Sequence, residues 1–162
     1  MNKYALAGII SSLVLILDQL TKVAVRESMV LWTSDNIIPG FFNLVHVVNR
    51  GAAFGFLNNA DISWQRNFFI AVTFAALGAI GLLLKSVNNS DTLQIAGLGC
   101  ILGGAVGNLI DRILYHEVTD FLDFYYGSYH WPAFNVADIA ICVGAFAMII
   151  SLYRNKDESG SV

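Results

Sequence analysis

The chain has 162 residues, of which 56% are hydrophobic and only 13% are charged, and its mean hydropathy is +0.63. Soluble domains are about 45–50% apolar and about 25% charged, so this composition argues against a cytosolic enzyme and excludes a disordered chain. The net charge of −3 and the nine scattered lysine and arginine residues argue against a nucleic-acid-binding groove. We therefore expect a single domain embedded in a membrane.

Four apolar stretches approach the length of about 20 residues that a helix needs to cross a membrane. In chain order they are Ala5 to about Val25, Asn67–Leu84, Leu93–Ile110 and Val136–Tyr153. Four such stretches in so short a chain favour a membrane protein over a soluble helical bundle.

The first stretch also has features of a signal peptide, because Lys3 precedes an apolar run that ends at Leu17. However, Asp18 and Gln19 follow where a cleavage site would need small residues. The run alone is too short to span, so we extend the helix through Lys22. Asp18 and Lys22 are then an i,i+4 pair within a membrane span.

An even number of spans puts both termini and the Lys85–Thr92 connection on one side of the membrane. The count of basic residues does not decide which side this is, but they lie closer to span ends there, so we predict that it is cytoplasmic. Long connections at about 26–66 and 111–135 then face outward. Residues 1–154 are expected to form one domain and 155–162 a polar cytoplasmic tail.

Both outer connections contain segments rich in β-branched and aromatic residues. Phe41–Asn49 follows a Pro39-Gly40 turn, and Val118–Tyr126 precedes a Gly127-Ser128 turn, so each is predicted to be a strand. Asp61–Arg66, with its tryptophan, is predicted to lie at the membrane interface. The expected fold is an all-α membrane protein with four transmembrane helices, a small extracytoplasmic β-sheet and an interfacial segment.

Acidic residues from four segments are predicted to reach the outer face, where ionisable side chains usually mark a functional site. Asp18 with Lys22 and Asp111 with Arg112 could be structural clamps between helices as well as parts of a site. Asn108 precedes the second pair by one helical turn, and Asn135 lies three residues before Asp138.

Asp120 and Asp138 have no basic residue within four positions, which argues against a structural salt bridge for either. Two carboxylates that approach each other cannot both ionise readily, so they share a proton. One can then take a proton from water while the other hydrogen-bonds a carbonyl oxygen, as in aspartic proteases.

Rival sites have weaker signals. The chain lacks a GxSxG nucleophile motif, and its histidines and cysteines lack metal-ligand spacing. Glycines four residues apart indicate close helix packing. We interpret the histidines as loop residues, the cysteines as small apolar residues and the glycines as packing positions: His46, His116, His130, Cys100, Cys142, Gly99, Gly103 and Gly107.

Five segments make the chain resemble the lipoprotein signal peptidase family, also called signal peptidase II. They are Asp18-Gln19-Leu20-Thr21-Lys22, Asn49-Arg50-Gly51-Ala52-Ala53-Phe54-Gly55, Gly103 to Arg112, Val118-Thr119-Asp120-Phe121 and Pro132 to Asp138. All five occur in the family's order and together they extend over nearly the whole chain.

The resemblance implies an aspartyl endopeptidase of the bacterial cytoplasmic (inner) membrane that needs no metal or other cofactor. It implies removal of signal peptides from prolipoproteins, just before a diacylglyceryl-modified cysteine. The implied catalytic pair is Asp120 and Asp138, and the nearby Asp123 is not catalytic. The positions implied to bind substrate or support the site are Asp18, Lys22, Asn49, Gly51, Asn108, Asp111, Arg112, Asn135 and Ala137.

The expected partners are diacylglyceryl prolipoproteins and membrane lipid, with no nucleic acid, and the expected state is a monomer. Two other classes are considered: a small proton-coupled transporter with Asp18 and Asp111 as a relay, and a structural membrane subunit. Gly51 and Gly55 make the first outer connection a candidate lid.

Overall fold

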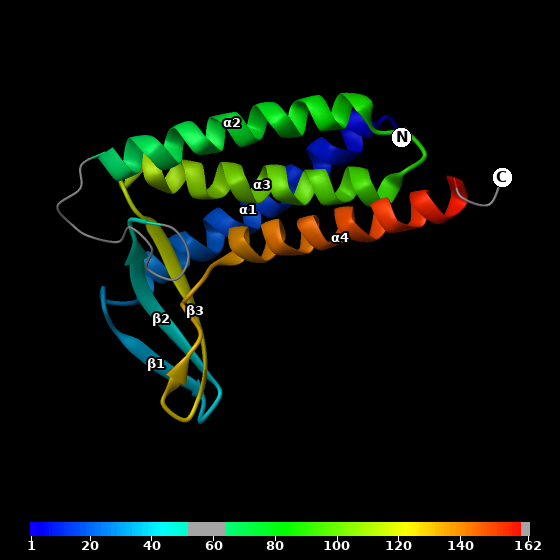
Figure 1. Cartoon of the computed structure of the whole chain (residues 1–162). Helices are drawn as coiled ribbons and strands as arrows, with labels where there is room; N and C mark the ends of the chain where they lie inside the picture. The colour runs from blue at the N-terminus through cyan, green and yellow to red at the C-terminus, as the bar shows by residue number, and fades with distance from the viewer. Residues whose placement is uncertain (52–63, 160–162) are drawn as a thin grey trace.

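The computed structural model describes residues 1–51 and 64–159. Four long helices form a bundle (Figure 1). In chain order they are α1 (Lys3–Ser28), α2 (Trp64–Ser86), α3 (Thr92–Leu114) and α4 (Val136–Ser159). Each is long and apolar enough to cross a membrane, which confirms the four predicted spans.

The helices begin where polar side chains satisfy the first backbone donors. Asn2 accepts a hydrogen bond from the Tyr4 N–H ahead of α1, and Asp91 accepts one from the Gln94 N–H ahead of α3. Such caps replace hydrogen bonds that a helix cannot make within itself. They lie outside the apolar runs, which is why both helices begin before the predicted spans.

Helix α3 is at the centre of the bundle and packs against α1 and α4 through glycines. A Cβ atom on Gly103 would lie 2.6 Å from the Ser11 carbonyl oxygen of α1. Gly99 meets Ala7 of α1 in the same way, while Gly104 meets the first turn of α4. The glycine spacing is therefore a packing pattern, as predicted.

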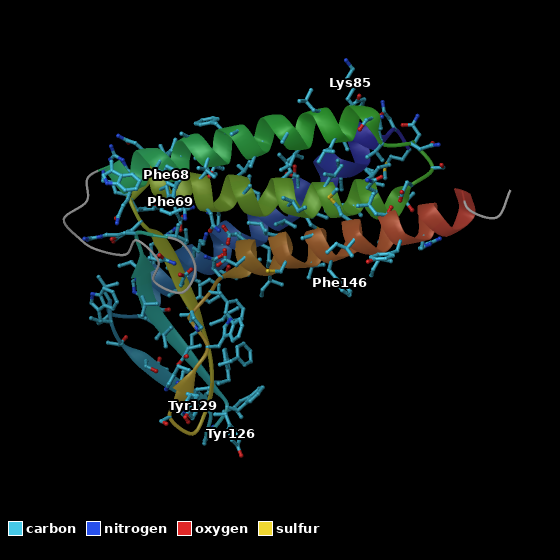
Figure 2. The ribbon with its side chains drawn as sticks, in the orientation of Figure 1. Phe68, Phe69, Lys85, Tyr126, Tyr129 and Phe146 are labelled. Atoms are coloured by element: carbon cyan, nitrogen blue, oxygen red, sulfur yellow. The ribbon has the colours of Figure 1, made fainter. Side chains whose placement is uncertain are left out.

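The outer faces of the bundle are covered by apolar side chains. Leu13, Leu82 and Phe146 are 62%, 72% and 65% exposed, respectively. Phe146 points away from the neighbouring helices (Figure 2). Apolar faces of this extent suit contact with lipid.

A sheet of four antiparallel strands adjoins the bundle. The strands, in chain order and in spatial order, are β1 (Ser34–Ile38), β2 (Phe42–Asn49), β3 (Val118–Tyr126) and β4 (Tyr129–His130). β2 and β3 confirm the two predicted strands, and β1 and β4 are additional. The turn glycines Gly40 and Gly127 have φ of 80° and 61°, a conformation that glycine adopts without steric cost.

Two details differ from the sequence expectations. Trp64–Arg66 of the predicted interfacial segment form the first turn of α2, which therefore begins before Asn67, while Asp61–Ser63 and the candidate lid residue Gly55 lie outside the described residues. His46 and His130 lie in β2 and β4 rather than in loops.

The sheet lies at one end of the bundle, where α1 and α3 end and α2 and α4 begin (Figure 1). The start of α1 and the end of α4 lie at the opposite end (Figure 1). Residues from the helix ends and from β2 and β3 therefore meet at a single end of the molecule.

Candidate active site

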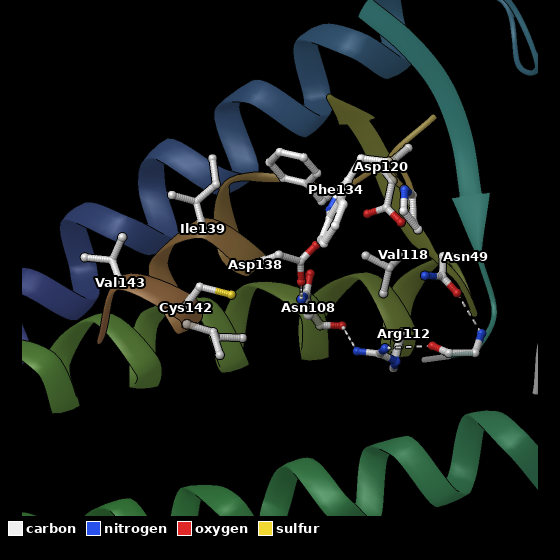
Figure 3. A pocket seen from close by; sticks show the side chains of 15 residues that line it. Asn49, Asn108, Arg112, Val118, Asp120, Phe134, Asp138, Ile139, Cys142 and Val143 are labelled. Atoms are coloured by element: carbon white, nitrogen blue, oxygen red, sulfur yellow. Dashed lines mark hydrogen bonds between the residues drawn. The ribbon is translucent and has the colours of Figure 1, made fainter. Parts of the chain in front are cut away.

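A cavity of about 540 Å³ lies where the sheet meets α3 and α4 (Figure 3). Much of its wall is apolar, including Phe134, Ile139 and Val143. Its polar lining consists of Asn49, Asn108, Arg112, Asp120 and Asp138. An apolar cavity with a few convergent polar groups is the usual form of a small binding site.

Two carboxyl groups reach this cavity from different parts of the chain. Asp120 comes from β3, and Asp138 comes from the first turn of α4 (Figure 3). The Asp120 side chain is almost fully buried, with an exposed fraction of 3% for the residue. Within residues 1–51 and 64–159, neither carboxyl group forms a salt bridge.

Asn135 connects the two carboxyl groups. Its side-chain Nδ2 donates to Oδ1 of Asp120 at 2.6 Å, and its backbone N–H donates to Oδ2 of Asp138 at 3.2 Å. The backbone N–H of Asp138 donates in return to Oδ1 of Asn135 at 3.0 Å. Asn135 is fully buried and does not line the cavity; it lies behind the two acids, which suits a supporting position.

The second oxygen of Asp138 is bound by Asn108. Nδ2 of Asn108 donates to Oδ1 of Asp138 at 2.9 Å, and Oδ1 of Asn108 accepts from Nζ of Lys22 at 2.9 Å. The Lys22 ammonium therefore orients the Asn108 amide so that its NH₂ group faces Asp138.

The environment of Asp120 shifts its titration. Burial raises the pKa of Asp120 to about 7, and the negative charge of Asp138 contributes to this increase. The hydrogen bonds from Asn135 and Asn49 oppose the increase. A carboxyl group that titrates near neutral pH in a cavity is suited to acid–base catalysis.

A buried ionic cluster lies behind the cavity. Nζ of Lys22 lies 2.9 Å from Oδ2 of Asp18 and 3.4 Å from Oδ2 of Asp111, so the predicted Asp18–Lys22 pair is confirmed. Oδ1 of Asp18 accepts from the Ala137 N–H at 2.9 Å, which ties α1 to the start of α4. Ala137 thus supports the site through its backbone.

Asp111 and Arg112 do not act as the pair that the sequence allowed. Successive residues on a helix point about 100° apart, so Asp111 faces Lys22 while Arg112 faces the cavity. Arg112 donates to the carbonyl oxygens of Asn108 and Gly51 at 3.3 and 3.4 Å. Its guanidinium also lies over the ring of Phe69 in α2.

Asp123 lies on the other face of β3, as strand alternation requires. It accepts one hydrogen bond from Asn43 and is paired with His130 at 2.9 Å. It does not line the cavity.

Three residues of this region were missed at the sequence level: Gln19, Arg26 and Thr119. Gln19 donates to the Gly107 carbonyl oxygen at 3.2 Å, and Arg26 donates to Oγ1 of Thr119 at 3.0 Å. The repeat of polar residues at 18, 22 and 26 on one helix face is a signal that would have included Arg26. Among the described residues, no three His, Cys, Asp or Glu side chains gather as a metal site.

The sequence model of the family described as Signal peptidase (SPase) II, Peptidase_A8, matches residues 10–154. The chain belongs to this family. It is 77% identical to a lipoprotein signal peptidase of Maridesulfovibrio salexigens, over 96% of this chain and all of that protein. It is 48% identical to a lipoprotein signal peptidase of Oleidesulfovibrio alaskensis, over 95% of this chain and 98% of that protein.

A solved bacterial membrane enzyme has the same fold as this chain. The TM-score is 0.83 at 33% sequence identity, covering 96% of this chain and 91% of that one. The resemblance expected from the five segments is therefore confirmed. The chain is a bacterial multi-pass membrane enzyme of an aspartic peptidase family, not the transporter or structural subunit considered as alternatives.

Proposed function

We propose that this chain removes signal peptides from diacylglyceryl-modified prolipoproteins, cutting just before the lipidated cysteine, with Asp120 and Asp138 as the catalytic pair. One observation carries the assignment of the pair: the buried carboxyl group of Asp120 and the half-buried one of Asp138 enter one cavity, form no salt bridge within the described part of the chain, and are joined through Asn135. The relatives named lipoprotein signal peptidase support the class of substrate.

The two carboxyl groups have different roles in the proposed step. With a pKa of about 7, Asp120 retains a proton in a substantial fraction of molecules at neutral pH, unlike an ordinary aspartate. Asp138 accepts hydrogen bonds from Asn108 and Asn135 at the N-terminus of α4, where the helix dipole favours an anion. We therefore assign the shared proton to Asp120 and the negative charge to Asp138.

Peptide hydrolysis then follows the course of an aspartic protease. Asp138 takes a proton from a water molecule, and the water oxygen adds to the scissile carbonyl carbon. Asp120 gives its proton to the carbonyl oxygen, which forms a neutral gem-diol. The C–N bond breaks as Asp138 returns its proton to the leaving nitrogen and Asp120 recovers one from the diol hydroxyl.

The position of the cavity suits a substrate held in a membrane. The acyl chains of a diacylglyceryl group confine the substrate to the membrane plane, which supplies orientation that a soluble protease must obtain through contacts. Apolar side chains of α4 line part of the cavity, including Ile139 and Val143. Arg112 and Asn49 place donors near the two acids (Figure 3) and can bind substrate carbonyl groups.

The cavity end of the bundle is assigned to the extracytoplasmic face and both termini to the cytoplasm. Lys3 and Lys85 at the opposite end support this, since cytoplasmic segments are enriched in basic residues. We also propose that residues 1–154 form one domain, that residues 155–162 form a cytoplasmic tail and that the enzyme is a monomer.

The orientation is testable with single cysteines in a Cys100→Ala, Cys142→Ala background. An impermeant thiol reagent applied outside intact spheroplasts should label Ser34→Cys in β1 and spare Asn88→Cys between α2 and α3. The reverse pattern would contradict the proposed orientation. Light scattering of the purified enzyme in detergent gives the mass that tests the monomer.

The activity is tested with purified protein in micelles and a precursor peptide made with and without the diacylglyceryl group. Mass spectrometry should show cleavage just before the cysteine of the lipidated peptide only. Asp120→Asn and Asp138→Asn should each lower turnover more than about 100-fold, as expected when an acid–base group is lost. Asp123→Asn is the matched control and should keep its activity. Turnover near that of the unmodified enzyme in either of the first two variants would remove that residue from the pair.

A further inference from the structure

We propose that Arg26 is a positioning residue for Asp120, because it holds the neighbouring Thr119 from behind the strand. This inference rests on the proposed role of Asp120. Arg26 lies in the last turn of α1, and neither it nor Thr119 lines the cavity. It therefore acts on Asp120 through Thr119 rather than by touching the substrate.

Three groups hold the Arg26 guanidinium in place. Its Nη1 donates to Oγ1 of Thr119 at 3.0 Å and lies 3.5 Å from Oδ1 of Asp111. The group also lies over the ring of Tyr115, 4.3 Å from the ring centre. The side chain is only 17% exposed. A planar guanidinium fits such a multiple contact better than an ammonium does, because its donors have fixed directions.

The backbone N–H, the carbonyl oxygen and the hydroxyl of Thr119 each form a hydrogen bond. Its backbone N–H donates to Oδ2 of Asp111 at 3.1 Å, and its carbonyl oxygen accepts from Nδ2 of Asn135 at 3.3 Å. Its hydroxyl accepts from Arg26. Because side chains alternate along a strand, Thr119 points away from the cavity and Asp120 points into it. Fixing Thr119 therefore fixes the backbone from which the Asp120 carboxyl group extends.

Arg26 also balances the charge of the buried cluster. Asp18, Lys22, Asp111 and Arg26 alternate in sign along their contacts and together carry no net charge. The Lys22 charge acts on Asp120 and favours its ionised form. Removing the Arg26 charge leaves the cluster with one excess negative charge, which favours the protonated form of Asp120.

The other charged and polar groups around Asp120 are unchanged by a substitution at 26. They are Asp138 of α4, Arg112 of α3, Asn49 of β2 and Asn135 before α4. A change in the pH dependence of an Arg26 variant thus reports on Arg26 and its cluster. A Thr119 variant, in contrast, removes a contact without changing any charge.

The test measures kcat and KM for the lipidated precursor peptide with Arg26→Met, Arg26→Lys, Thr119→Val and Thr119→Ser. Arg26→Met and Thr119→Val should lower kcat about 10- to 100-fold, because a small displacement of a reacting group has such an effect, with KM within about twofold. Thr119→Ser retains the hydroxyl group and should stay within about twofold of the unmodified enzyme. Arg26→Met should move the alkaline limb of the pH profile to higher pH, and Arg26→Lys should leave it in place.

Two controls separate the possible failures. Arg66→Met removes a surface arginine at the same end of the bundle, bound to His116, and should change nothing. If Asp120→Asn keeps its turnover, the proposed catalytic role of Asp120 fails, and the role of Arg26 fails with it. If Asp120→Asn is inactive while Arg26→Met and Thr119→Val keep kcat and the pH profile, only the role of Arg26 fails. The positioning role of Arg26 would also be overturned if kcat of Arg26→Met and Thr119→Val fell only in proportion to the loss of folded protein while the pH profile stayed unchanged.

Discussion

Asn135 and Asp138 hydrogen-bond each other in both directions, each through its backbone N–H to the side-chain oxygen of the other. This reciprocal arrangement is a capping box, which satisfies two backbone donors at the start of α4. The NH₂ group of Asn135 binds Asp120 and the Thr119 carbonyl oxygen. The structure that begins α4 therefore also sets the relative positions of the two proposed catalytic acids.

The pH dependence of activity follows from Asp120. With a pKa of about 7, Asp120 loses its proton as the pH rises through neutrality. We expect kcat/KM, which reports on the free enzyme, to fall above about pH 7. The measurement is a pH profile of cleavage of the lipidated peptide. A profile that stays flat to pH 9 would show that the protonated form of Asp120 is not required.

Asn135→Ser separates the cap from the contact with Asp120. Serine also caps helices, but it lacks the amide that donates to Asp120. Because that donation lowers the pKa of Asp120, its loss should raise this pKa and move the alkaline limb to higher pH. Turnover should fall about tenfold or more as Asp120 loses its orientation. Asn43→Ser is the control, since Asn43 binds Asp123 instead; an equal shift in that variant would contradict the assignment.

The stability of the enzyme should depend on the same carboxyl group. The pKa of Asp120 is raised from 3.8 to about 7 on folding, so between these values the folded state binds more protons than the unfolded state. The contribution of Asp120 to the free energy of unfolding is thus fully present below about pH 4 and is lost as the pH rises to about 7. Asp120→Asn cannot ionise and should melt at a higher temperature than the unmodified enzyme at pH 8. Melting temperatures of both proteins in detergent at pH 5 and pH 8 check this. If Asp120→Asn raised the melting temperature more at pH 5 than at pH 8, the prediction would be contradicted.

The sequence predicts the spans well, because crossing a membrane demands apolar length that few other structures need. It also predicts the Asp18–Lys22 pair, since an i,i+4 spacing places two side chains on one helix face. β1 was missed because all residues of Ser34–Ile38 are exposed and no alternation marks them. β4 has only two residues, too few for any pattern.

The parts of the site that could not be predicted are contacts between distant segments. Asp111 was paired with its neighbour Arg112 in the sequence, but it meets Lys22 of α1. Arg26 was assigned to a connection because the apolar stretch ends near Val25, whereas α1 continues to Ser28. The contact between Asp111 and Lys22 depends on how α1 and α3 pack, which no local spacing encodes, whereas the polar repeat at 18, 22 and 26 does give a local signal for Arg26.

Chelation tests the absence of a metal in the proposed reaction. Every proton transfer in that reaction is assigned to Asp120 or Asp138. We therefore expect cleavage of the lipidated peptide to keep its rate, within about twofold, after incubation with a chelator and its removal. Loss of activity that added divalent ions restore would contradict the assignment.

Gly107 determines how closely α3 approaches the buried cluster. A Cβ atom at this position would collide with Oδ2 of Asp18, the oxygen that pairs with Lys22 at 2.9 Å. Gly107→Ala should therefore destabilise the folded enzyme by about 1–3 kcal/mol, the usual cost of overpacking. It should also lower turnover, because Lys22 orients Asn108 and through it Asp138. Gly78→Ala in α2 is the matched control, since its added Cβ has no neighbour within 4 Å; it should keep turnover and lose no stability, because alanine favours a helix over glycine. Thermal unfolding and peptide cleavage measure the two effects, and equal behaviour of the two variants would show that the close approach at Gly107 has no energetic importance.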